Sequence, residues 1–198
     1  MLNFEIDPRV LSPLVPAGTE LDDWQGRTFV SVVGFLFLDT RVFGAAIPWH
    51  RDFEEVNLRF YVRRMASDGW RRAVVFVKEI VPRTAIAWTA RALYGENYVA
   101  LPMWHRIEPE TGDVEFITEH YWGYARQRGG RTTEYRVEHP RWRARAATVS
   151  RLDCDVATLY GSQFVECLKA PPASAFLADG SNVTVYGGTS LLPSREDR

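Results

Sequence analysis

The sequence predicts one mostly β domain of the α+β class, and three features lead to this prediction. Residues 55–62 alternate polar and apolar side chains, which is typical of a half-buried strand. Residues 27–39 form an apolar run rich in β-branched and aromatic side chains, as in a strand covered on both faces. Residues 115–126 and 131–138 form a hairpin pattern joined through Gly129-Gly130.

Composition places the chain among folded globular proteins. Of its 198 residues 46% are hydrophobic and 25% are charged, which excludes wholesale disorder. The net charge of -1 gives no electrostatic reason to expect nucleic acid or an anionic membrane as partner. We interpret the arginines at 141, 143, 145 and 151 as the solvated face of a strand.

Localisation and cofactors are predicted from what the sequence lacks. Residues 1–16 do not resemble a signal peptide, and the longest apolar run, 29–38, is half the ~20 residues of a membrane span. We therefore expect a cytoplasmic protein with reduced thiols at Cys154 and Cys167. No zinc, nucleotide or Gly-x-Ser-x-Gly motif occurs, so we expect no metal and no cofactor. The histidines at 50, 105, 120 and 139 lie in separate segments.

The elements follow in chain order from periodicity and turn residues. Residues 7–21 predict a short helical turn closed by Pro16-Ala17-Gly18, 27–39 a strand and 41–53 a loop. Strands are predicted at 55–62 and 73–81, a helix at 84–94, a strand at 98–107 and then the 115–138 hairpin. A helix over 155–168, capped by Asp153 or Asp155, precedes a second hairpin of 175–177 and 182–186. We expect a single domain over 1–190 and a polar tail at 191–198.

The predicted strand at 55–62 contains the best candidate site. Glu55, Asn57, Arg59 and Tyr61 share one face, because side chains alternate along a strand. The face is either the wet side of an antiparallel sheet or the concave, ligand-holding side of a curved one. In the second case it offers a carboxylate, an amide, a cation and a phenol in one row.

Lys78 is a second candidate, since it interrupts an apolar strand. The alternation places it on one face with Val74, Phe76 and Ile80. Burial there would lower its pKa and leave part of it as a neutral amine nucleophile. The alternative is a lysine that extends to water along its apolar stem. Glu55 and Lys78 are thus the candidate catalytic residues.

Several motifs carry a family resemblance. They are residues 11–18, 29–37 and 55–62, Ala-Leu-Tyr-Gly-Glu-Asn-Tyr-Val-Ala-Leu-Pro-Met at 92–103, and Glu-Tyr-Arg-Val-Glu-His-Pro at 134–140. The chain resembles the YqjF-like "domain of unknown function 2071" family, and the likeness extends to the strand near Val185. The family is uncharacterised and is grouped by fold with acetoacetate decarboxylase. The resemblance implies an antiparallel β cone or barrel with a central cavity and two or three short helices packed outside.

The decarboxylase carries an Arg-Glu-x-Trp-Gly-aromatic-Pro-Lys-Lys motif, whose first lysine forms a Schiff base. The nearest match here is 91–99, where Arg91 and Gly95 fit and Tyr94 replaces the tryptophan. Tyr98 and Val99 stand in place of the lysines, so decarboxylation of the acetoacetate type is not implied. By the same resemblance Glu55 matches an acid of the cavity strand, and Arg91 is suited to bind a carboxylate.

The leading hypothesis is a domain that binds, or also transforms, a small organic acid or carbonyl compound. The ligand-binding candidates are Glu55, Asn57, Arg59, Tyr61, Arg91, Glu96 and Tyr98. A non-catalytic ligand sensor uses the same cavity, whereas a protein-interaction module would use the tryptophans at 49, 88, 104, 122 and 142. The sequence does not decide whether the protein is an enzyme, and it leaves a homo-oligomer open.

Overall fold

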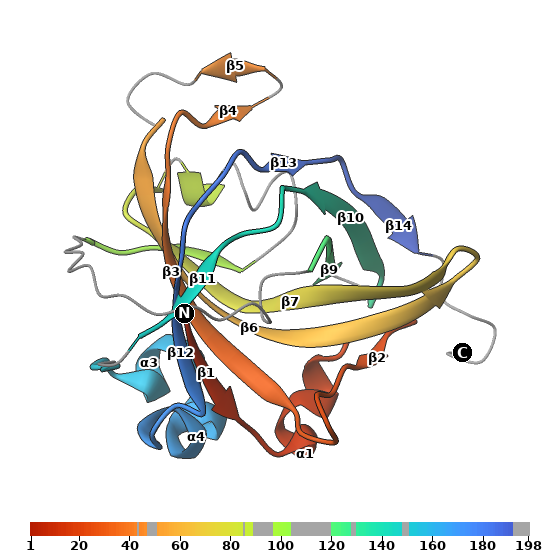
Figure 1. Ribbon diagram of the computed structural model, residues 1–198, viewed down its shortest axis with the longest axis vertical. Helices are drawn as coiled ribbons and strands as arrows, with labels where there is room; N and C mark the ends of the chain where they lie inside the picture. The colour runs from red at the N-terminus through yellow and green to blue at the C-terminus, as the bar shows by residue number, and fades with distance from the viewer. Residues whose placement is uncertain are drawn as a thin grey trace.

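Strands dominate the structure, a computed structural model that describes residues 1–42, 44–46, 51–84, 86–88, 97–103, 120–127, 130–147 and 151–191 (Figure 1). Twelve strands of these residues form one sheet. They are β1 (Leu2–Glu5), β2 (Glu20–Leu21), β3 (Phe29–Phe37), β6 (Phe53–Ala66), β7 (Gly69–Val81), β8 (Tyr98–Ala100), β9 (Trp122–Arg126), β10 (Thr132–Glu138), β11 (Ala144–Ala146), β12 (Ser174–Ala178), β13 (Thr184–Val185) and β14 (Thr189–Leu191). A separate hairpin of β4 (Arg41–Val42) and β5 (Ala45–Ala46) projects at the top of Figure 1.

The sheet is built around two long strands, β6 and β7. The strand order is β11-β12-β1-β3-β6-β7-β9-β10-β13, with β2 paired to β6, β8 to β7 and β14 to β10. β6 and β7 pair from Val56↔Ile80 to Ala66↔Gly69, joined by the turn predicted at Asp68-Gly69. β3 pairs with β6 from Val30↔Phe60 to Phe37↔Phe53. The predicted strands at 27–39, 55–62 and 73–81 are therefore confirmed as β3, β6 and β7.

The resemblance implies an antiparallel β cone or barrel, and the barrel is wrong for the described strands. Their sheet is open, because its strand order ends at β11 on one side and β13 on the other. It is mixed, because β8 and β9 both run parallel to β7. Parallel pairing requires the chain to cross over between strands, and the segments between β7, β8 and β9 provide this length. The predicted hairpin of 175–177 and 182–186 is also wrong, since β12 pairs with β1 and β11, whereas β13 pairs with β10.

Short helices cover one face of the sheet, at the bottom of Figure 1. They are α1 (Pro8–Leu11), the 3₁₀ turn η1 (Ser12–Leu14), α3 (Val156–Tyr160), the 3₁₀ turn η2 (Ser162–Phe164) and α4 (Val165–Lys169). Asp155 caps α3 by accepting from the Thr158 amide at 3.1 Å, as predicted. The expected continuous helix at 155–168 is broken at Gly161, whose φ of 109° suits glycine alone.

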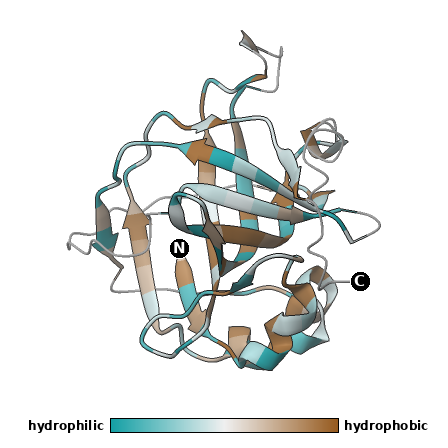
Figure 2. Cartoon of the chain, turned by 90° about the vertical axis from the view of Figure 1, so that its right-hand side faces the viewer, coloured by the Kyte–Doolittle hydropathy of each residue, from teal (hydrophilic) through white to brown (hydrophobic). Residues whose placement is uncertain are grey.

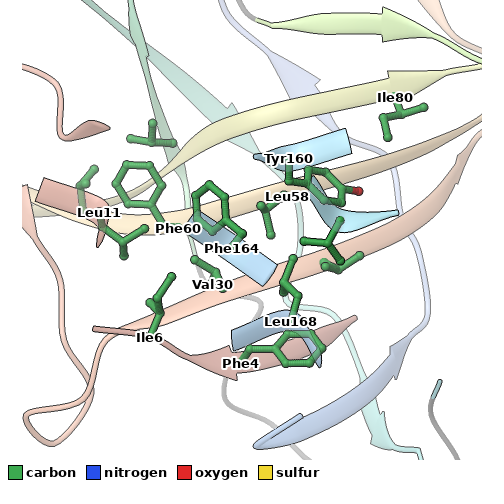
Figure 3. Close-up of a cluster of buried hydrophobic side chains, with 14 of the residues drawn as sticks. Phe4, Ile6, Leu11, Val30, Leu58, Phe60, Ile80, Tyr160, Phe164 and Leu168 are labelled. Carbon is green, nitrogen blue, oxygen red and sulfur yellow. The ribbon is translucent and has the colours of Figure 1, made fainter. Parts of the chain in front are cut away.

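The core lies between these helices and the sheet. Figure 3 shows Phe4, Val30, Leu58 and Phe60 from the strands meeting Phe164 from the helical side. All five side chains are at most 2% exposed. Figure 2 shows hydrophobic and hydrophilic stretches along the strands and helices. β6 presents Leu58, Phe60 and Val62 to this core, because side chains alternate along a strand.

Other predicted elements are only partly tested. Residues 122–126 and 132–138 form the predicted hairpin, and β8 is the start of the strand expected at 98–107. Most of the helix predicted at 84–94 lies outside the described residues. Of the tail predicted at 191–198, Leu191 is the last residue of β14, and 192–198 lie outside the described residues. No helix within the described ranges combines the length and apolarity needed to cross a membrane.

Candidate functional site

The polar face of β6 is mostly withdrawn from water. Glu55 and Asn57 are 2% and 1% exposed, and Arg59 and Tyr61 are half-buried. The opposite face of β6, with Leu58, packs in the core. A freely solvated outer face does not fit Glu55 and Asn57.

Glu55 is a hydrogen-bond acceptor at one end of this face. Its Oε1 accepts from Asn57 Nδ2 at 3.1 Å, and its Oε2 accepts from the Tyr98 hydroxyl at 3.2 Å. Tyr98 reaches this position from β8, so the fold brings together three of the predicted site residues that are up to 43 positions apart. The sequence analysis missed Glu79, which pairs across the strands with both Asn57 and Tyr98 and is 2% exposed. A carboxylate inside the apolar run 73–81 was the available signal.

On this face, Asn57 Oδ1 and Arg59 Nε are buried without a hydrogen-bond partner among the described residues. Arg59 also has no carboxylate partner in the described part of the chain. Its guanidinium carbon lies 6.0 Å from the centre of the Tyr61 ring. Burial, and then the charge of Arg59, lowers the pKa of the Met1 amino group to about 6.

Tyr61 belongs to a hydrogen-bonded row that crosses four strands. The Tyr61 hydroxyl lies 2.6 Å from Ser31 Oγ on β3. The Ser31 hydroxyl in turn donates to Asn3 Oδ1 on β1 at 2.6 Å. Asn3 Nδ2 in turn donates to Ser174 Oγ on β12 at 3.0 Å. The imidazole of His120 lies over Tyr61, with ring centres 4.7 Å apart.

A pocket of about 310 Å³ opens at the Tyr61 end of the face. Of the predicted site residues, Tyr61 alone is among the described residues that line it. The aromatic side chains around it are Trp24, Phe29, Tyr61, His120 and Phe176. Its described charges are largely paired: Arg72 Nε donates to Asp22 at 2.6 Å, and Arg27 donates to Glu5 at 2.6 Å.

The face predicted for Lys78 is confirmed for Ile80 but wrong for Val74 and Phe76. The register of β6 and β7 shifts between Leu58 and Arg59, so that Leu58 opposes Lys78 whereas Arg59 opposes Phe76. Because directly opposed residues point to the same side, this bulge places Lys78 with Leu58 and Ile80, and leaves Phe76 with Arg59. Lys78 and Glu55 therefore lie on opposite faces of the sheet.

Another buried carboxylate lies on the Leu58 side of the sheet, near the β6–β7 turn. Glu134, 6% exposed, accepts from Arg71 at 2.7 Å and from Arg64 at 3.2 Å. The buried Tyr124 hydroxyl donates to it at 2.6 Å. Arg71 also lies over the Trp122 ring, 4.2 Å from its centre. We call Glu134, Arg64, Arg71 and Tyr124 the Glu134 cluster.

Several residues singled out in the sequence cannot be assigned to these sites or excluded from them. Arg91, Glu96, Trp49, Trp104, His50 and His105 lie outside the described residues. Trp88 is 72% exposed, whereas Trp122 packs beside the core, so the tryptophans that can be placed do not share one environment.

Metal and thiol chemistry find little support in the described ranges. No group of three or more His, Cys, Asp or Glu side chains there could hold a metal ion. Both cysteines are free, and burial raises the pKa of the Cys167 thiol to about 11. A thiol with a raised pKa is a poor nucleophile at neutral pH.

Comparison with known proteins gives one family and one relative. The profile of the domain of unknown function 2071 family, described as "Uncharacterized conserved protein", matches residues 1–115 and 107–182. The chain is also similar to the "Uncharacterized protein YqjF" of Bacillus subtilis (strain 168), with 34% identity over 68 residues. That match covers 34% of this chain and 28% of the relative. The chain belongs to the domain of unknown function 2071 family.

Proposed function

We propose that the chain binds a small organic acid or carbonyl compound on the polar face of β6, with Arg59 holding the acidic group. The observation that carries this proposal is Arg59, a half-buried arginine with no carboxylate partner in the described part of the chain and a buried, unbonded Nε. Taking a guanidinium out of water is unfavourable unless an anion compensates for the lost hydration. A ligand carboxylate supplies that anion and suits the two-pronged geometry of arginine.

The neighbouring groups fit the remainder of such a ligand. Asn57 Oδ1 is a buried acceptor without a donor among the described residues, and Tyr61 presents a hydroxyl at the pocket. Because the Ser31 hydroxyl donates to Asn3, Tyr61 donates its own proton to Ser31 and can only accept from a ligand. Both groups are then acceptors and suit a hydroxyl substituent next to the acid.

Schiff-base chemistry is not part of the proposal. Tyr98 stands where the resemblance places the reactive lysine, and its hydroxyl donates to Glu55. Lys78 lies on the other face of the sheet. Whether the bound acid is transformed is a separate question from binding, and Glu55 is the candidate acid or base for that step.

The test compares acids with their neutral amides. Thermal unfolding is followed with acetate, pyruvate, acetoacetate and phenylacetate, each against its amide, for wild type, Arg59→Gln and Arg63→Gln. Arg63 is the matched control, since it lies on the same strand face but donates to Glu20 at 2.7 Å. We expect at least one acid to raise the Tm of wild type and Arg63→Gln while its amide does not. Arg59→Gln should lower the affinity for that acid about 10- to 100-fold, which corresponds to the loss of a charge-assisted hydrogen bond.

Two results would overturn the proposal. One is that no acid of the panel raises the Tm of the wild type. The other is that Arg59→Gln binds the acids as tightly as Arg63→Gln does.

A further inference from the structure

The pocket beside Tyr61 is lined by rings from well-separated parts of the chain. Trp24, Phe29 and Tyr61 contribute from the first third, and His120 and Phe176 from later segments. Its volume of about 310 Å³ is at the lower end of the range for small-molecule sites. Aromatic walls favour planar, apolar groups, because rings stack offset or edge to face.

The charged side chains of the pocket all have hydrogen-bond partners. Asp22 is bonded to Arg72 at 2.6 Å, and Arg27 to Glu5 at 2.6 Å. The Asp23 carboxylate accepts from the Gly26 amide at 2.8 Å. These pairs leave ring faces as the main recognition surface of the pocket, with the acid-binding arginine next to it rather than in it.

Trp24 is held at the pocket by a tight turn. The Trp24 and Arg27 amides each donate to the other residue's carbonyl, at 2.9 and 3.1 Å. Gln25 and Gly26 between them have φ of 53° and 77°. A glutamine in this left-handed region is uncommon, and such strain tends to collect at ligand sites.

The turn is anchored to the polar face itself. The Asp22 amide donates to the Tyr61 carbonyl at 3.0 Å, and the Asp22 carboxylate accepts from Arg72 on β7. Trp24 is nevertheless 41% exposed. The indole is thus presented on a fixed support at the solvent side of the pocket, where a ring entering the pocket would meet it.

We propose that the pocket binds the aromatic ring of an aryl-substituted carboxylic acid, and that Trp24 sets the preference for aryl over alkyl acids. The ring occupies the space between Trp24, Phe29 and Phe176. The acid extends past Tyr61 to Arg59, whose guanidinium lies 6.0 Å from the Tyr61 ring centre. The acid part of this inference rests on the proposed function, whereas the ring part rests on the pocket alone.

The experiment measures Kd by calorimetry for phenylacetate, 3-phenylpropionate, butyrate, hexanoate and the neutral phenylacetamide. The proteins are wild type, Trp24→Ala, Trp24→Phe, Trp70→Ala and Arg59→Gln. Trp70 is the matched control, because it is 52% exposed on β7 and is not among the pocket residues. Circular dichroism and Tm confirm that each variant folds.

We expect wild type and Trp70→Ala to prefer aryl over alkyl acids by about tenfold or more. Trp24→Ala should lose most of that preference, and Trp24→Phe should keep most of it. Equal affinity for aryl and alkyl acids in the wild type, or an unchanged preference in a folded Trp24→Ala, would overturn the inference.

The two proposals fail in different ways. If phenylacetate and phenylacetamide bind equally well, and Arg59→Gln changes neither, the acid is not recognised by Arg59 but the ring pocket stands. If all acids bind equally and Arg59→Gln weakens all of them, the acid site stands and the ring pocket does not.

Discussion

Two buried polar regions on β6 and β7 differ in how their charges are partnered. In the Glu134 cluster each charge meets an opposite charge: Glu134 accepts from Arg64, Arg71 and Tyr124. On the other face of the same strands, Arg59 has no carboxylate partner within the described ranges, and its Nε and Asn57 Oδ1 are buried without hydrogen bonds. Folded chains rarely leave buried polar groups unsatisfied unless something else completes them. The first region therefore stabilises the sheet, and the second is the region where a ligand is expected.

The largest expected effect is in the Glu134 cluster. Glu134→Gln removes the anion between two arginines whose side chains are only 27% and 22% exposed. Breaking a buried ion pair from one side leaves an uncompensated charge, so we expect about 3 kcal/mol less free energy of unfolding in urea. Glu138→Gln is the control, because its pair with Arg136 is half-exposed and should change stability by about 0.5 kcal/mol or less. Equal losses in both variants would contradict the comparison.

The pH dependence of the free energy of unfolding should reveal the contribution of Tyr124 in the Glu134 cluster. Burial, and then the hydrogen bond to Glu134, raise the pKa of Tyr124 above its ordinary value of 10. A raised pKa in the folded state means that the stabilisation is complete below pH 10 and is lost as the pH rises above it. One such proton corresponds to about 1.4 kcal/mol of unfolding free energy per pH unit.

Tyr124→Phe should remove the part of the fall in unfolding free energy at alkaline pH that comes from this phenol. Tyr186→Phe is the control, since Tyr186 is 42% exposed. The measurement is urea unfolding at several pH values from neutral to alkaline. An alkaline slope that stays the same in Tyr124→Phe would show that the phenol is not held protonated by the cluster.

A smaller effect is expected on the polar face. Asn57→Leu loses one hydrogen bond to Glu55 but also removes a buried, unbonded oxygen. We expect these two changes to offset each other to within about 1 kcal/mol in urea unfolding. Asn3→Leu is the control: its amide bonds both Ser31 and Ser174 and it is 2% exposed, so it should cost about 2 kcal/mol or more. If Asn57→Leu costs as much as Asn3→Leu, the polar face is as fully bonded as the rest of the sheet.

The smallest effect on stability is expected for Arg59→Met. Arg59 forms no ion pair among the described residues, and its positive charge repels that of the Met1 amino group. The free energy of unfolding of this variant should lie within about 0.5 kcal/mol of the wild-type value, or slightly above it, since methionine keeps the apolar stem. Arg71→Met, which breaks the pair with Glu134, should instead cost about 3 kcal/mol. A large loss in Arg59→Met would assign Arg59 a structural role.

Much of the local structure could be predicted because side-chain direction along a strand is a local property. The alternation at 55–62 identified β6 and its polar and apolar faces, and the apolar runs identified β3 and β7. The cap at Asp155 and the hairpin of β9 and β10 also follow from neighbouring residues. Four of the predicted site residues, Glu55, Asn57, Arg59 and Tyr61, were thus placed on one face by pattern alone.

Only the tertiary structure decided what these faces contact. Whether the sheet closes, which strands β8, β9 and β12 join, and how Glu134 meets Arg71 63 positions away depend on long-range pairing. A single bulge opposite Leu58 moved Lys78 to the face away from Glu55, since a one-residue shift reverses side-chain direction. The same long-range pairing assembled the pocket from Trp24, Tyr61 and Phe176. Local sequence therefore determined which residues share a strand face, and the packing of distant segments determined whether that face meets solvent, a charge or a pocket.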